Sequence, residues 1–142
     1  MTYFGMFRAD GAAAAMRAQD ALLLRMVFTE SGLDADASAP YVTAMREPGR
    51  LEGGLAWYQA TRRADALKIG PVRVPTTFVW SDGDWAIGRT AAANCRRYVS
   101  AAYRFVRLPG ISHWVPDQAP DALAEAILER VRKTLPRGTT GG

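Results

Sequence analysis

The sequence has 142 residues, of which 49% are hydrophobic and 23% charged, values typical of a globular domain that exclude a wholly disordered chain. Its formal net charge is +4, but the arginines are dispersed, and no run of them is long enough to form a nucleic-acid-binding surface. A single cysteine, Cys95, excludes an intrachain disulfide, and with only one histidine there is no Cys/His cluster for a metal, so we expect no cofactor or metal.

The first half of the chain predicts helices and supplies no strand. Apolar spacing, capping residues and Pro-Gly stop signals indicate three helices, over 12–28, 40–47 and 51–64. Asp10 is expected to cap the first helix, and Pro40 to begin the second. The segment 1–7 (MTYFGMF) is aromatic and apolar, whereas chain termini are usually polar, so we expect it to have been cut from something longer.

The stretch from Val72 to Trp114 reads as a strand, a loop, a helix, a second strand and a second loop. Its strands are expected over 74–80 and 103–108, and its helix over 90–99. A unit of this length implies parallel strands and a right-handed crossover. The two loops then leave from one edge of the sheet, where open α/β folds bind their ligands. Asp84 closes the first loop and His113 the second, so we expect these side chains to be neighbours in space.

The predicted pair has a chemical use. A carboxylate that accepts the N–H of a histidine fixes the tautomer of the ring and stabilises the imidazolium, which leaves the far nitrogen free as a general base. In α/β-hydrolases the order along the chain is nucleophile, acid, histidine, and Asp84 and His113 follow the last two places of that order. The alternative is an aspartate in an ordinary turn and a histidine on a surface loop.

A final helix is expected over 121–135, packed on the sheet through its apolar residues Leu123, Ile127, Leu128 and Val131. The predicted elements do not form a complete α/β fold, because three helices are followed by only two parallel strands, which cannot cover their own faces and edges. We therefore expect the second half of a larger α/β fold. Its expected parts are a helical cap or lid over 1–66, a C-terminal part of the core over 67–135 and a flexible tail over 136–142.

These features resemble one family. The run VPTTFVWSDGD resembles the penultimate catalytic strand of α/β-hydrolases of the epoxide hydrolase and haloalkane dehalogenase type, which ends in a Gly-x-x-Asp turn. Asp84 takes the place of the catalytic acid, although Ser81 replaces the glycine. The run LPGISHWVPDQAP resembles the histidine loop and puts His113 in the catalytic place. The resemblance implies a partial α/β-hydrolase fold, with a helical cap followed by a C-terminal βαβα unit of a parallel sheet.

The cap segment resembles the epoxide hydrolase branch. In that branch two cap tyrosines hydrogen-bond the epoxide oxygen, one near the start of the cap and one in a Trp-Tyr pair. TYFGMF puts Tyr3 in the first place, and PYVTAMREPGRLEGGLAWYQA puts Tyr58, after Trp57, in the second. Dehalogenases use halide-binding tryptophan or asparagine residues instead. The alternative for each tyrosine is simple packing in the cap with a satisfied hydroxyl.

The N-terminal half of the family has no counterpart in these residues. The sequence contains no His-Gly-x-Pro loop and no Gly-x-Ser-x-Gly or Gly-x-Asp-x-Gly elbow. The resemblance implies that an aspartate from that half attacks the epoxide while Tyr3 and Tyr58 donate to the departing oxygen. His113, oriented by Asp84, would then activate water to hydrolyse the alkyl–enzyme ester. We expect the isolated chain to be inactive or very weak, because the members of such a triad act as a unit.

Other readings stay open: a non-catalytic truncated remnant or dimerising module, or a fragment of a haloalkane dehalogenase or esterase. The expected partners are a small apolar substrate and either the missing N-terminal half or a second copy, since open sheet edges and apolar faces favour association. No signal peptide is evident, and no apolar stretch reaches the length of a membrane span. We therefore expect a cytoplasmic protein that binds neither membranes nor nucleic acid.

Overall fold

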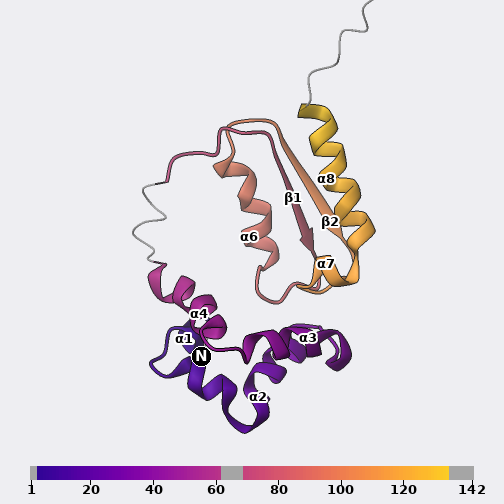
Figure 1. Cartoon of the computed structure of the whole chain (residues 1–142). Coiled ribbons are helices and arrows are strands. Elements are labelled where there is room, and N and C mark those ends of the chain that lie inside the picture. The colour runs from indigo at the N-terminus through magenta and orange to yellow at the C-terminus, as the bar shows by residue number, and fades with distance from the viewer. Residues whose placement is uncertain (1–2, 62–68, 135–142) are drawn as a thin grey trace, which may run out of the picture. The chain divides into compact units, whose positions relative to one another are not determined.

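The computed structural model describes residues 3–61 and 69–134 (Figure 1). The chain divides into two compact units, Met1–Ile69 and Gly70–Gly142, which are described one at a time. The expected flexible tail and the expected end of the cap fall outside the described residues, so both stay predictions.

The described part of the first unit is built from helices. They are α1 (Tyr3–Phe7), α2 (Ala12–Glu30), α3 (Ala35–Met45) and α4 (Arg50–Ala60). Its core consists of buried apolar side chains, Met16, Leu24, Phe28, Leu33, Val42, Leu51 and Leu55. Helix α4 packs against α1, α2 and α3, so the segments that carry Tyr3 and Tyr58 lie side by side within this unit (Figure 1).

Helix α2 is interrupted by a kink. Residues 18–21 leave helical geometry, and three of them have positive φ values of 51°, 56° and 60°. Such left-handed backbone is costly for residues other than glycine. Asp20 in the kink also forms an exposed ion pair with Arg46, the C-cap residue of α3. At the start of α2, the N-cap is Gly11 at φ 74° with no side-chain hydrogen bond, so the prediction that Asp10 caps this helix was wrong.

Helix α3 begins earlier than predicted. The side chain of Asp34 accepts a hydrogen bond of 2.8 Å from the N–H of Ala37 and caps the helix. Pro40 therefore lies inside α3 and does not begin it, because the aspartate cap upstream already satisfies a free N–H of the first turn. Helix α4 ends at Ala60, short of the predicted end, because Thr61 has an extended backbone.

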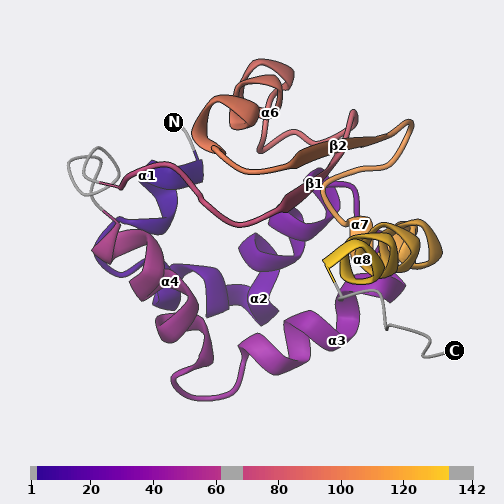
Figure 2. The same cartoon turned by 90° about the horizontal axis from the view of Figure 1, so that it is seen from above.

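The described part of the second unit is the predicted βαβα unit, with one short helix added after β2 and with the helix predicted over 90–99 divided into an α-helix and a 3₁₀ turn. Its elements are β1 (Thr76–Ser81), α6 (Arg89–Asn94), the 3₁₀ turn η1 (Cys95–Tyr98), β2 (Tyr103–Leu108), α7 (Val115–Gln118) and α8 (Pro120–Thr134). Strands β1 and β2 pair in parallel, and the register places Ser81 opposite Leu108. Helices α6 and α8 lie on opposite faces of the pair (Figure 2). This arrangement confirms the predicted α/β class with a small parallel sheet.

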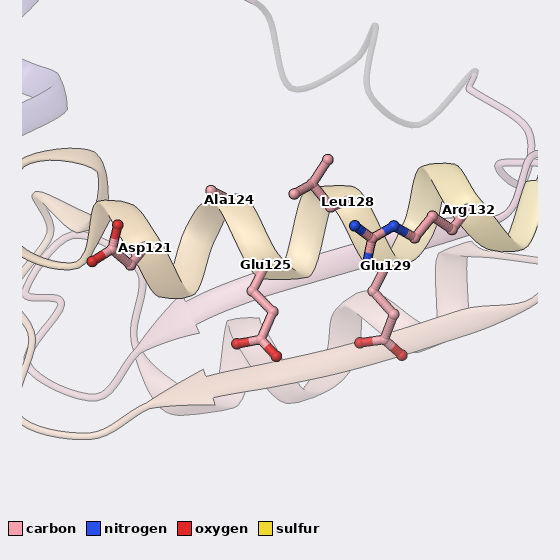
Figure 3. A pocket seen from close by; sticks show the side chains of 6 residues that line it. All are labelled: Asp121, Ala124, Glu125, Leu128, Glu129 and Arg132. Carbon is pink, nitrogen blue, oxygen red and sulfur yellow. The ribbon is translucent and has the colours of Figure 1, made fainter.

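Helix α8 packs on β1 through only part of its predicted apolar surface. Ala126 is buried, and Arg130 donates hydrogen bonds to the Oγ1 of Thr77 and the backbone oxygen of Thr76. The two elements border a groove lined by Thr77, Val79, Leu123, Ala126, Ile127, Arg130 and Val131. Leu128 instead projects from the outer face of the helix (Figure 3), so the prediction that it packs on the sheet was wrong. Two positions along an α-helix are about 200° apart, which separates Leu128 from Ala126.

Candidate active site

Two loops at the ends of adjacent parallel strands carry the predicted acid and histidine. Strand β1 ends at Ser81, and the turn that follows contains Asp84. Strand β2 ends at Leu108, and the chain passes through Gly110, at φ 72°, to reach His113. Because neighbouring parallel strands end at the same edge of the sheet, both loops emerge there together.

The structure brings Asp84 and His113 into contact. The Nδ1 of His113 lies 3.1 Å from the Oδ1 of Asp84, a hydrogen-bond distance. The same carboxylate oxygen accepts backbone N–H groups from Ala86 at 2.8 Å and Ile87 at 2.9 Å, which fix its position. The Asp84 side chain is only 9% exposed, whereas that of His113 is 42% exposed. The histidine is therefore held through Nδ1 on a nearly buried carboxylate, while its ring stays accessible.

This geometry selects one tautomer of the histidine. With the proton on Nδ1 and donated to Asp84, the neutral ring carries its lone pair on Nε2. Within the described residues, Nε2 makes no hydrogen bond. A ring in this state can take a proton from a water molecule, and the carboxylate then stabilises the imidazolium.

Sequence reasoning missed the contacts that join the two loops. The hydroxyl of Ser81, which stands where the family that the sequence resembles has glycine, donates to the backbone oxygen of Ser112 at 2.5 Å. The N–H of Gly83 donates to the backbone oxygen of Ile111 at 3.0 Å. A Cβ atom on Gly83 would lie 2.7 Å from that oxygen, so only glycine allows the two loops to come this close. Strand composition gave no signal for these contacts, since they depend on the register of β1 against β2.

The structure also brings the two predicted cap tyrosines together within the first unit. The ring of Tyr3 in α1 lies edge-on to that of Tyr58 in α4, with their centroids 6.4 Å apart. Tyr58 makes further edge-on contacts with Phe4, Phe7 and Trp57 at centroid distances of 5.2, 4.9 and 5.0 Å. Both tyrosine side chains are half-buried. These ring contacts pack α1 against α4 within the first unit.

Two hollows bordered by α8 in the described part of the second unit contain none of the predicted site residues. One lies along the outer face of α8, lined by Asp121, Ala124, Glu125, Leu128, Glu129 and Arg132 (Figure 3). These positions recur at helical spacing along a single helix, and five of the six are polar or small, as on a solvated face. The hollow offers no group placed to work with His113.

Two properties of the described residues bear on cofactors and membranes. Over residues 3–61 and 69–134, no three His, Cys, Asp or Glu side chains converge as they would around a metal ion. In the same ranges, no helix combines the length and apolar character needed to cross a lipid bilayer.

Comparisons with curated proteins point to epoxide hydrolases, although no protein-family model matches the chain. Human epoxide hydrolase 4 is 28% identical over 87 residues, which cover 61% of this chain and 24% of that protein. Mouse epoxide hydrolase 3 is 26% identical over 110 residues, which cover 73% of this chain and 30% of that protein. The chain thus spans 24% to 30% of the length of these curated relatives.

Several solved structures with the same fold are also epoxide hydrolases. Epoxide hydrolase A from Mycobacterium thermoresistibile matches 93% of this chain with a TM-score of 0.73 and 20% identity, over 52% of its own length. A variant of an epoxide hydrolase from Bacillus megaterium, in complex with its product, matches 92% of the chain with a TM-score of 0.71 and 17% identity, over 50% of its length. The chain therefore has the fold of about half of an α/β-hydrolase of the epoxide hydrolase type, which confirms the resemblance seen in its sequence.

Proposed function

We propose that this chain, an epoxide hydrolase-like segment of the α/β-hydrolase fold, contributes the acid–histidine pair and the cap tyrosines of an enzyme that hydrolyses epoxides through an alkyl–enzyme ester. The observation that carries the proposal is the 3.1 Å contact between His113 and Asp84 in the loops after two adjacent parallel strands. The similarity to epoxide hydrolases in both sequence and fold supports the choice of reaction.

In the proposed reaction His113 acts in the second half of the cycle. Its Nε2 takes a proton from water as the water oxygen attacks the ester carbonyl. The imidazolium then returns that proton to the departing alkoxide, so the diol leaves and the aspartate carboxylate is regenerated. Asp84 keeps the other proton on Nδ1 and offsets the positive charge that develops on the ring. The backbone N–H groups of Ala86 and Ile87 support this role, because they donate to the carboxylate of Asp84 and fix it in position to accept the N–H of the histidine.

The cap tyrosines act in the first half of the cycle. Tyr3 and Tyr58 donate hydrogen bonds to the epoxide oxygen as the ring opens, which stabilises the developing alkoxide. Their neighbours Phe4, Phe7 and Trp57 supply an apolar, aromatic surrounding. We therefore propose a small apolar epoxide as substrate.

The nucleophile of this reaction must come from polypeptide outside these 142 residues. The sequence contains no nucleophile elbow, and the chain matches only about half of the length of the solved structures. We propose that the other half supplies an aspartate that attacks an epoxide carbon and forms the ester. Without it, the chain is expected to turn over epoxides very weakly or not at all.

Complementation tests the proposal. The chain is mixed or co-expressed with an N-terminal half that carries a His-Gly-x-Pro loop and an aspartate elbow, and diol formation from styrene oxide is measured. We expect turnover by the mixture and none by either part alone. The variant His113→Gln should abolish turnover in the mixture, whereas Glu125→Gln on the outer face of α8 should leave it unchanged.

Two results would count against the proposal. One is robust epoxide or ester hydrolysis by the chain alone that His113→Gln abolishes, because the nucleophile would then lie within the 142 residues. The other is a stable complex of the two halves that forms no diol, which would favour a non-catalytic or dimerising module. Turnover of haloalkanes or esters in place of epoxides would assign the chain to another branch of the hydrolases.

A further inference from the structure

Asp82 links the loop that carries Asp84 to the loop that carries His113. Its Oδ2 accepts two hydrogen bonds from the guanidinium of Arg107, at 3.1 Å from Nε and 2.6 Å from Nη2. Its Oδ1 accepts the backbone N–H of Gly110 at 2.7 Å. One carboxylate therefore holds a side chain from β2 and the first turn of the histidine loop at the same time.

Both partners of Asp82 favour its charged form. The hydrogen bonds from Arg107, followed by that from Gly110, lower the pKa of Asp82 below its ordinary value. The side chain is 19% exposed, whereas that of Arg107 is 48% exposed. The carboxylate of Asp82 is thus ionised around neutral pH, and it is the less exposed member of the ion pair with Arg107.

The contacts of Asp82 lie close to His113 along the chain. Arg107 belongs to β2, opposite Trp80 in the register, and so has a fixed backbone. Gly110, at φ 72°, turns the chain immediately after β2, only three residues before His113. A carboxylate that fixes both the strand and the turn limits how far the imidazole can move from Asp84.

We propose that Asp82 is a positioning residue: together with Arg107 and the N–H of Gly110, it clamps the histidine loop to the acid turn and keeps the Nδ1–H of His113 on the carboxylate of Asp84. The catalytic consequence rests on the proposed function, but the effect on the ring does not. Two other contacts join the loops, Gly83 to Ile111 and Ser81 to Ser112, so loss of the clamp loosens the pair and does not separate it.

Nitrogen-15 NMR of the imidazole tests this inference directly. His113 is the only histidine in the sequence, so in an untagged protein every imidazole signal reports this site. The spectra of the parent chain, Asp82→Asn and Arg107→Lys are compared at neutral pH. Asp82→Asn removes the charge, and Arg107→Lys keeps a charge but loses the planar two-bond fork. Glu125→Gln, which removes a negative charge from the exposed face of α8, is the matched control.

We expect a single Nδ1–H tautomer in the parent and in the control. In both clamp variants a share of the Nε2–H tautomer should appear, and exchange of the Nδ1 proton with solvent should rise about two- to tenfold, as for the loss of one ordinary hydrogen bond. Should Asp82→Asn fail to fold, Arg107→Lys decides the question alone. Parent-like tautomer and exchange in folded clamp variants would overturn the inference.

This outcome is separable from that of the proposed function. If complementation yields no diol, the imidazole spectra still report whether the clamp sets the tautomer. If the clamp variants leave the tautomer of the ring unchanged, the inference about Asp82 fails, but the complementation experiment still tests the proposed function. Where turnover is observed, loosening the clamp should lower kcat more than it changes KM, since both oxygens of Asp82 are engaged by Arg107 and Gly110 and act on the histidine loop.

Discussion

A single oxygen of Asp84 faces the Nδ1 of His113 and two backbone N–H groups. The substitution Asp84→Asn therefore changes how the histidine is held while it keeps the size of the side chain. In Asp84→Asn the amide can face the histidine in two ways. If its oxygen still accepts the backbone N–H groups, it is uncharged and holds the Nδ1–H of the histidine less firmly. If its nitrogen faces the ring, it donates to Nδ1 and imposes the Nε2–H tautomer. Either change removes the orienting carboxylate.

We therefore predict that Asp84→Asn lowers the rate of ester hydrolysis in the complemented enzyme by on the order of 10²- to 10⁴-fold, the range typical of general acid–base catalysis. Single-turnover kinetics with styrene oxide measure that rate. Asp121→Asn, an exposed aspartate of α8, is the matched control and should behave as the parent. A rate for Asp84→Asn within twofold of the parent would contradict the assigned role.

Gly83 gives a second prediction at the scale of single residues. A methyl group there would meet the backbone oxygen of Ile111 at 2.7 Å, so Gly83→Ala must push the histidine loop away from the acid turn. Overpacking of this kind costs about 1–3 kcal/mol. We expect a lower melting temperature by calorimetry, and no such change for Gly70→Ala, where a Cβ atom meets nothing within 4 Å. Equal stabilities of the two variants would show that the loops are not in contact in solution.

Topology explains why some of these residues could be predicted and others could not. Asp84 and His113 each follow a strand, and the crossover rule alone places them at one edge of the sheet. The pairing of Asp82 with Arg107 depends on where β1 stops relative to β2, and sequence patterns do not fix that register. Asp82 therefore reads from the sequence as an ordinary turn residue.

Between elements, an ion pair joins α2 to α4 in the first unit. Arg17 donates to Glu52 through both ends of its guanidinium, and this pairing lowers the pKa of Glu52 to about 2 from an ordinary value of 4.5. A carboxyl group with a lowered folded-state pKa stabilises the fold above its unfolded-state pKa. That contribution is lost as the pH falls from 4.5 toward about 2.

We predict that Glu52→Gln flattens the dependence of the melting temperature on pH over this window. Thermal unfolding followed by circular dichroism at several pH values is the measurement. Glu30→Gln, at the exposed end of α2, serves as the control and should keep the slope of the parent. If Glu52→Gln retains the full slope, the ion pair does not form in the folded protein in solution.

The elements themselves were predicted with uneven success, for identifiable reasons. Strand β2 was placed correctly because Pro109-Gly110 ends an apolar run and leaves little choice. The kink in α2 could not be foreseen from local sequence patterns. Local propensity favours a continuous helix there, and the sequence carries no glycine or proline that would mark a kink at residues 18–21.

At the scale of the whole molecule, the described part of the second unit presents a two-stranded sheet and a groove beside β1. Within the described residues β1 has a single partner strand, β2. On α8, Ile127 and Val131 line the groove and are 53% and 46% exposed. Open strand edges and apolar surface favour association with other polypeptide.

We therefore predict that the chain alone self-associates, and that Val131→Glu weakens this association by placing a charge in the groove. Sedimentation equilibrium gives the mass of the species present. Glu125→Gln, on the opposite side of α8, should leave the mass distribution unchanged. A monodisperse monomer with cooperative unfolding would refute the prediction and would mean that this surface is stable in water.

The proposed reaction assigns to His113 the hydrolysis of an ester formed on an aspartate of the other half of the enzyme. The most direct test is mass spectrometry of the complemented protein after incubation with an epoxide, using the parent chain and His113→Gln. We expect the N-terminal half to gain the mass of one epoxide and to keep it when His113→Gln is present. With the parent chain, we expect no lasting adduct while diol accumulates. An unmodified N-terminal half in the presence of His113→Gln, while the parent mixture forms diol, would contradict the proposed reaction.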